Sequence, residues 1–239
     1  MALAGVASAA LTLDKEMTGF TTSNFTYSWA TSQSSAAVTL ILGETAMSRL
    51  DSGYNNGWNE AFASFTLTNG KLGETTIGQI TLENKYDGDI DPKAIRVSNT
   101  DLGQSWGDKI MKQMFAGSVH AGNAAWDTAE YAALTFAIDA DGNASAILST
   151  IDANGTITTL GSNTISTGVS FDGISGLKLN RNADNLDNID TAYIYSGSWE
   201  ASDLTTITNK ALYALVPEPT TATLSLLALA GLAARRRRK

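Results

Sequence analysis

Short alternating segments of apolar and polar residues, separated by turn-forming residues, constrain the fold of this chain most. Between Leu11 and Leu215 these segments are rich in Thr, Ile, Val and aromatic residues, which is typical of strands. We predict strands at residues 25–29, 37–42, 63–67, 77–82, 133–138, 144–151, 156–160, 176–179 and 192–195. Only Asp108–Ala116 has apolar residues spaced for one helical face, so we expect a helix there. The pattern predicts an all-β sandwich of two antiparallel sheets.

Turn chemistry connects several of these segments. Asn-Gly and Asp-Gly pairs accept the positive φ that tight hairpins need. Such a pair occurs in each of three turn segments: Thr68-Asn69-Gly70, Asp139–Asn143 and Asp152–Gly155. The segment 144–151 lies between two such turns, which predicts a meander of three consecutive strands. Asp139, Asp141 and Asn143 also offer oxygen ligands for a cation, but hairpin chemistry explains them fully.

Residue counts exclude several classes of site. The chain has no cysteine and one histidine, His120. A disulfide framework, a Cys-based zinc or iron–sulfur site, a thiol nucleophile and a multi-histidine metal centre are therefore impossible. With 24 acidic and 16 basic residues the net charge is -8, and an acidic body repels the phosphates of nucleic acid.

The last residues differ from everything before them. Val216-Pro217-Glu218-Pro219 is followed by an apolar stretch, Ala222–Ala234, and then by a basic end. This order predicts a stop-transfer segment, in which a short hydrophobic helix enters the lipid and the basic cluster stays in the cytoplasm. The apolar stretch is shorter than the roughly 20 residues that span a bilayer. An amphipathic helix packed on the domain is the alternative, although the stretch has no polar face.

This tail resembles the PEP-CTERM sorting signal of Gram-negative bacteria, from Val216 to Lys239. The resemblance implies that an exosortase-type transpeptidase recognises Pro217, Glu218 and Pro219 and cuts the tail near them. It also implies transient anchoring in the inner membrane, followed by release to the cell surface, outer membrane or exterior. The membrane stop comprises Arg235, Arg236, Arg237, Arg238 and Lys239. Without these five basic residues the net charge would be -13 instead of -8.

The N-terminus supports export more weakly. Residues 1–10 are small and apolar, and Ala7-Ser8-Ala9 is typical of a signal-peptidase site, but a positive start is missing. We interpret this segment as the remaining end of a signal peptide, with an ordinary first strand as the alternative. The predicted organisation is thus a signal-like segment at 1–10, a β-sandwich at 11–215 and a sorting signal at 216–239.

The second half of the sandwich carries another resemblance. A strand, a turn at Asp139–Asn143, a second strand and a late strand at Ile189–Tyr195 follow one another, and Ala201–Leu204 matches a later loop. From Tyr131 to Ile207 this order resembles the LamG-like, concanavalin A-like family. The resemblance implies a jelly-roll sandwich of about a dozen strands, to which the tail adds a short C-terminal hydrophobic helix.

Some concanavalin A-like folds are glycoside hydrolases, so catalysis needs a test. Retaining enzymes need two carboxylates about 5 Å apart, which on one strand appear at alternate positions. None of the eight Glu residues has that spacing. His120 lies in a loop-like stretch without a partner motif. We therefore expect no catalytic residues and no enzyme activity.

Two ligand hypotheses remain. Asp87, Asp89 and Asp91 place hard oxygens at alternate positions, which suits Ca²⁺, against the simpler interpretation of a solvated acidic loop. Aromatic rings among amides suit sugar binding. The glycan candidates are Tyr54, Asn55, Trp58 and Trp106. For any single tryptophan, burial in the core is the simpler interpretation, and Trp29 in particular is expected there.

Taken together, the patterns predict an exported bacterial surface or matrix protein with a non-catalytic, lectin-like sandwich that binds carbohydrate. A hydrolase whose carboxylates come from separate strands is the first alternative. A purely structural matrix component without a ligand is the second.

Overall fold

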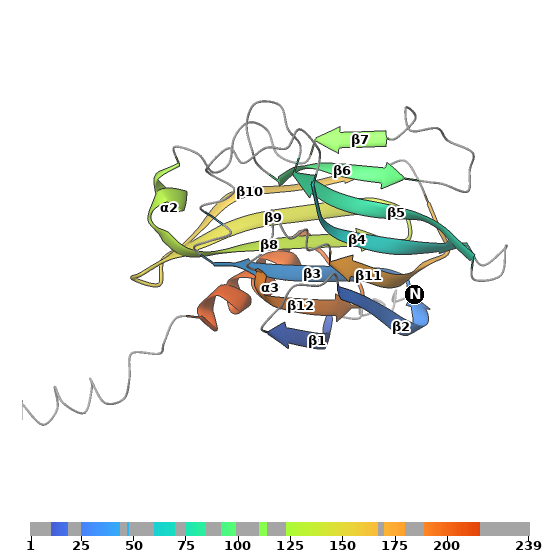
Figure 1. Cartoon of the computed structure of the whole chain (residues 1–239), viewed down its shortest axis with the longest axis horizontal. Coiled ribbons are helices and arrows are strands. Elements are labelled where there is room, and N and C mark those ends of the chain that lie inside the picture. Colours follow the sequence, from blue (N-terminus) through green and yellow to red (C-terminus); the bar gives the residue numbers. More distant parts are fainter. Residues whose placement is uncertain are drawn as a thin grey trace, which may run out of the picture.

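Two six-stranded antiparallel sheets form the body of the protein (Figure 1). The computed structural model describes residues 11–18, 25–43, 47, 60–69, 75–84, 92–98, 110–113, 123–166, 170–179 and 189–215. Sheet A contains, in spatial order, β1 (Thr12–Thr18), β12 (Ile189–Ser196), β3 (Ser35–Leu42), β8 (Ala129–Asp139), β9 (Asn143–Asp152) and β10 (Ile157–Ser166). Sheet B contains β2 (Phe25–Gln33), β11 (Gly173–Leu179), β4 (Glu60–Asn69), β5 (Thr75–Asn84), β6 (Pro92–Ser98) and β7 (Ile110–Gln113). Two helices, α2 (Ala124–Asp127) and α3 (Ala201–Tyr213), complete the described part.

The all-β jelly-roll class predicted from the sequence is confirmed. All the predicted strands coincide with observed ones, with shifts at their ends. The predicted meander is also present, because β8, β9 and β10 are neighbours in sheet A. Strands β1 and β6 were not predicted. The C-terminal hydrophobic helix predicted for the tail lies outside the described residues.

The helix predicted at Asp108–Ala116 is wrong where the structure describes it. Ile110–Gln113 is strand β7, which pairs with β6 through Ile95 opposite Lys112 and Val97 opposite Ile110. A short apolar run does not distinguish a helix from a strand by its periodicity. Pairing with a distant strand decided the conformation.

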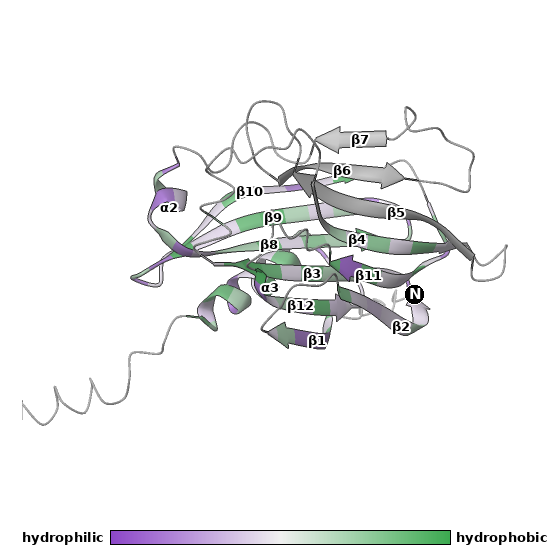
Figure 2. Ribbon diagram, viewed as in Figure 1, coloured by the Kyte–Doolittle hydropathy of each residue, from purple (hydrophilic) through white to green (hydrophobic). Residues whose placement is uncertain are grey.

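The main core lies between the two sheets. Phe136 of sheet A and Phe65 of sheet B meet there, with ring centroids 5.2 Å apart and planes tilted by 45°. Around them pack the fully buried Val38, Leu40 and Leu134, together with Leu177 from β11. Figure 2 shows the apolar residues concentrated along β3, β8, β9 and β12. This core is large enough to hold the sheets together without disulfides, which the chain lacks.

Sheet A is covered on both faces. Every residue of β3 is buried, and so is the run Ala132–Ile138 of β8. Sheet B covers one face, and α3 lies across the other (Figure 1). Double coverage explains why these strands have continuous apolar runs instead of strict alternation.

Helix α3 was missed by the sequence analysis, which placed Ala201–Leu204 in a loop. Its side facing sheet A carries Leu204, Ile207, Thr208, Ala211 and Leu212, a spacing of three and four residues that Leu215 continues just after the helix. Asp203 caps the start, because the Glu200 N–H donates to its Oδ2 at 2.9 Å. The three threonines disfavour helix locally, but each donates its hydroxyl to a carbonyl one turn earlier.

Candidate functional site: the carboxylates, the aromatic residues and the helix that precedes the tail

Most residues singled out from the sequence lie outside the described part of the chain. This holds for His120, for the calcium candidates Asp87, Asp89 and Asp91, and for the glycan candidates Tyr54, Asn55, Trp58 and Trp106. It also holds for Pro217, Glu218, Pro219 and for Arg235–Lys239. Their ligand roles remain predictions. The described residues nevertheless test the hairpin acids, three of the tryptophans and the segment that leads into the tail.

The carboxylate of Asp139 closes the β8–β9 hairpin. Its Oδ1 accepts the Asn143 N–H at 2.8 Å, and its Oδ2 accepts the Asn143 side-chain N–H at 2.9 Å. Gly142 has φ 80°, which residues other than glycine rarely adopt. The hairpin interpretation of Asp139 and Asn143 is therefore confirmed, since the carboxylate and the amide bond each other.

Asp152 has the same role in the β9–β10 turn. Its Oδ1 accepts the N–H groups of Thr156 at 2.7 Å and Asn154 at 2.9 Å. These backbone donors, Thr156 first, lower the pKa of the carboxyl below its usual value. Within the described residues, no three His, Asp or Glu side chains gather as a metal-binding group.

The three described tryptophans belong to the body of the fold. Trp126 of α2 is 2% exposed, as expected for a core residue. Trp29 is only partly buried: its ring meets Tyr27 edge-on and its N–H donates to Asp14 Oδ2 at 2.8 Å. Trp199 stands before α3 and donates to the Ile138 carbonyl at 3.2 Å. The expectation that Trp29 is fully in the core is thus too strong.

A buried chain of hydroxyls joins α3 to sheet A. Thr39 lies 2.8 Å from Thr135, and Thr135 lies 2.6 Å from Thr208, measured between their Oγ1 atoms. Thr208 donates to the Leu204 carbonyl at 2.6 Å. Each hydroxyl has one proton, so Thr208 must accept from Thr135, and Thr135 must accept from Thr39. The chain is therefore polarised from β3 to the helix.

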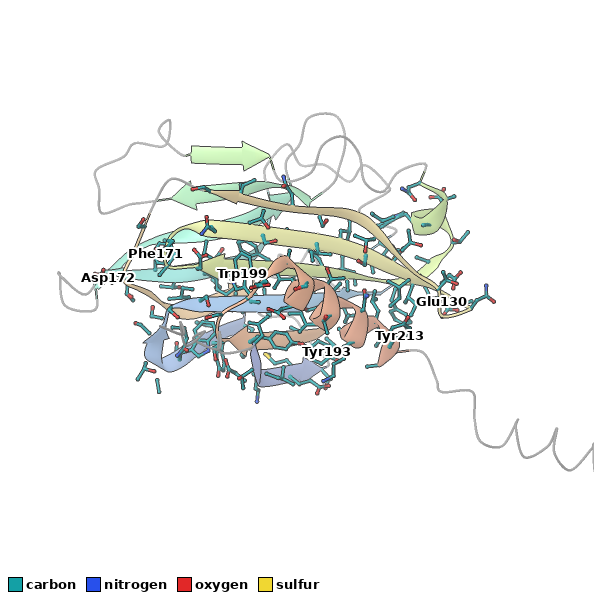
Figure 3. The ribbon with its side chains drawn as sticks, turned by 180° about the vertical axis from the view of Figure 1, so that it is seen from behind. Glu130, Phe171, Asp172, Tyr193, Trp199 and Tyr213 are labelled. Atoms are coloured by element: carbon teal, nitrogen blue, oxygen red, sulfur yellow. The ribbon has the colours of Figure 1, made fainter. Side chains whose placement is uncertain are left out.

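Tyr193 and Tyr195 of β12 pack in the same cluster as Leu204 of α3, on the α3-covered face of sheet A. Figure 3 labels Tyr193 beside the helix. Burial raises the pKa of Tyr195 to about 12, with smaller contributions from Tyr193 and Glu16. Burial, followed by the Glu16 carboxylate, also raises the pKa of Tyr193. Both phenols are neutral at neutral pH, so this face offers hydroxyl groups and aromatic rings but no additional charge.

Helix α3 ends where the predicted tail begins. Ala211 and Leu212 are buried against Ile41, Ala133 and Ile151 of sheet A. Leu215, two residues after the last helical residue, packs on the same cluster. Val216 and the Pro-Glu-Pro sequence follow directly. Among the described residues, no helix is both long and apolar enough to cross a membrane.

Three solved structures share a general likeness with the chain. The receptor-binding domain of botulinum neurotoxin mosaic serotype C/D has 9% identity and a TM-score of 0.30, covering 85% of this chain. A GH131 β-glucanase catalytic domain from Podospora anserina has 17% identity and a TM-score of 0.23, covering 73%. The binding domain of botulinum neurotoxin DC in complex with SialylT has 9% identity and a TM-score of 0.28, covering 85%.

The chain spans 46%, 63% and 47% of the lengths of those three structures. The fold class rests on the strand order given above, and these likenesses add nothing about ligands or activity. No curated protein matches the chain.

A protein-family model does match the C-terminus. It covers residues 215–239 and describes the PEP-CTERM protein-sorting motif. The match begins at Leu215, the residue that packs on sheet A after α3. A motif of this kind marks an exported protein that reaches the membrane through its C-terminal tail. The chain therefore carries the PEP-CTERM protein-sorting motif directly after a two-sheet β-sandwich.

Proposed function

We propose that this protein is exported, held briefly in the inner membrane by its tail, and processed there by an exosortase-type transpeptidase. The sandwich, residues 11–215, then remains at the cell surface, in the outer membrane or in the extracellular matrix as a non-catalytic domain. Residues 1–10 form a signal-peptide-like segment, and residues 216–239 are the removable signal. The match of the sorting motif to residues 215–239 carries this proposal.

Processing is tested in a Gram-negative host that has an exosortase-type enzyme. The tagged wild-type chain should be cut near Pro217–Pro219, which lowers its mass, and should then leave the inner membrane. Glu218→Ala, in the centre of the motif, should accumulate uncut in the inner membrane. Thr220→Ala is the matched control, since it is adjacent to the motif but outside it. Equal processing of Glu218→Ala and wild type would show that this motif is not the recognition element.

The non-catalytic part of the proposal is supported by what four of the described carboxylates do. Asp139 and Asp152 close hairpins, Asp203 caps α3, and Asp14 binds the Trp29 indole. Each of these groups has a structural partner. Release of reducing sugar from β-glucans by the purified sandwich would contradict the proposal and favour the hydrolase alternative.

Carbohydrate recognition is the finer part of the proposal. Trp29, Trp126 and Trp199 are engaged in the fold, which leaves Trp58 and Trp106 as the tryptophans for stacking on sugars. A glycan array should show binding that Trp58→Ala or Trp106→Ala weakens, whereas Tyr213→Ala, an exposed aromatic residue on α3, should not. Absence of binding to every glycan on the array, with calcium present, would favour the alternative of a purely structural matrix component.

Calcium is proposed at Asp87, Asp89 and Asp91. Calorimetric titration of the sandwich with CaCl₂ should show one saturable site that Asp89→Asn removes. Asp141→Asn, an exposed hairpin carboxylate, is the control and should leave the titration unchanged. A wild-type titration without heat of binding would remove calcium from the proposal.

A further inference from the structure

The direction of α3 decides from which end of the sandwich the tail leaves. The first half of the helix packs through Leu204 near Ile147 of β9, and the second half packs through Leu212 near Ile151. The helix therefore runs along β9 toward the β9–β10 turn. Figure 3 shows Tyr213 and Glu130 at this end, and Phe171 and Asp172 at the opposite end.

The link between the sandwich and the apolar stretch is short. Seven residue steps separate Leu215 from Ala222, which is about 25 Å when the chain is fully extended. Pro217 and Pro219 lie in this link, and proline disfavours continuation of a helix through it. The link can lengthen only if the end of α3 leaves sheet A, where Leu212 is fully buried.

The surface at this end has a defined chemistry. Tyr213 is 58% exposed, and an aromatic ring with a hydroxyl suits the headgroup region of a bilayer. Asp127 and Glu130 are exposed close by, beside the start of β8. Carboxylates oppose adsorption to anionic lipid. The body therefore approaches the membrane only because the tail holds it there.

We propose that this end of the sandwich, formed by Asp152–Thr156, Ala129–Tyr131 and Tyr213, is the surface that the anchored protein presents to the lipid headgroups. The proposal rests on the proposed function, because the tail must enter the membrane. The β8–β9 turn at Ala140–Gly142 lies at the other end of β9. With β9 upright on the membrane, this turn lies about 30 Å further from the bilayer, the length of a ten-residue strand.

The absence of cysteine makes the test direct. Ala153→Cys and Asp141→Cys each place a single thiol at an exposed turn position, one at each end of β9. The full chain, labelled with a fluorescent donor, is reconstituted into phosphatidylethanolamine–phosphatidylglycerol vesicles with an acceptor on the headgroup. Energy transfer should be at least about twofold greater from residue 153 than from residue 141, given the 30 Å difference. The same labelled variants truncated after Leu215 should show no transfer.

Two outcomes would overturn the proposal: equal transfer from both positions, or greater transfer from residue 141. Transfer from the truncated chain would overturn it as well, because the body would then bind lipid by itself. A long Gly-Ser insertion after Leu215 should reduce the difference between the two labels, and a difference that stays unchanged would contradict the argument from the link. If the full chain does not float with the vesicles, the failure lies with the tail as a membrane stop.

Discussion

The buried chain of hydroxyls from Thr39 through Thr135 to Thr208 leads to a prediction that depends on which hydroxyl donates to which, and not on side-chain size. Replacing Thr135 by the isosteric Val removes the acceptor of the Thr39 proton, and both positions are fully buried. An orphaned buried donor costs about 1–3 kcal/mol of unfolding free energy. Thr39→Val leaves no buried donor without an acceptor, because Thr135 still donates to Thr208. It should therefore cost only the roughly 0.5–1.5 kcal/mol of one lost hydrogen bond, less than Thr135→Val. The double variant Thr39→Val/Thr135→Val also has no Thr39 hydroxyl left without an acceptor, so it should be more stable than Thr135→Val alone.

Urea unfolding of the chain truncated after Leu215, followed by tryptophan fluorescence, measures these differences as midpoint shifts at constant slope. The two single variants match in shape and chemistry, so each is the control for the other. If Thr39→Val were as costly as Thr135→Val, or the double variant the least stable, the assigned proton order would be refuted.

Three further predictions concern the same body. Leu212→Ala should cost about 2–5 kcal/mol in urea unfolding, because the Leu212 side chain of α3 is fully buried against sheet A; an unchanged midpoint would mean that α3 is not docked in solution. Gly176→Ala should also destabilise, since its Cβ would lie 2.9 Å from the Tyr27 carbonyl oxygen. The pKa of Tyr195 is raised to about 12, so its neutral form stabilises the fold below pH 10 and that stability is lost as the pH rises from 10 through 12. Tyr195→Phe should reduce the decline in stability over this range, and an unchanged decline would contradict the assignment.

The strands could be predicted because their signals are local. Turn chemistry at Asp139–Asn143 and Asp152–Gly155 fixed the borders of β9, and the hydrogen bonds of both aspartates bear this out. The tail could be predicted for the same reason, since Pro217–Pro219 and the basic end form a contiguous pattern.

The remaining features depend on contacts distant in sequence. α3 contains Thr205, Thr206 and Thr208, which lower local helix propensity, and its stability comes from packing on sheet A. Two signals could have revealed it: the three-and-four spacing from Leu204 to Leu215, and a β3 that is apolar on both faces. β7 became a strand through pairing with β6, which no local pattern encodes. The acidic run Asp87–Asp91 and the glycan candidates Tyr54, Asn55, Trp58 and Trp106 lie outside the described residues.

The strand order of sheet A also restricts when this protein can fold during export. Strand β1 pairs with β12, and β3 lies between β12 and β8, so the earliest strands wait for residues 189–196. The outer face of β3 and β8 stays uncovered until α3 is available to pack on it as well. Pairing across such separations makes folding slow. The native sandwich can therefore be complete only once residues up to 213 are available, directly before the sorting motif at residues 215–239.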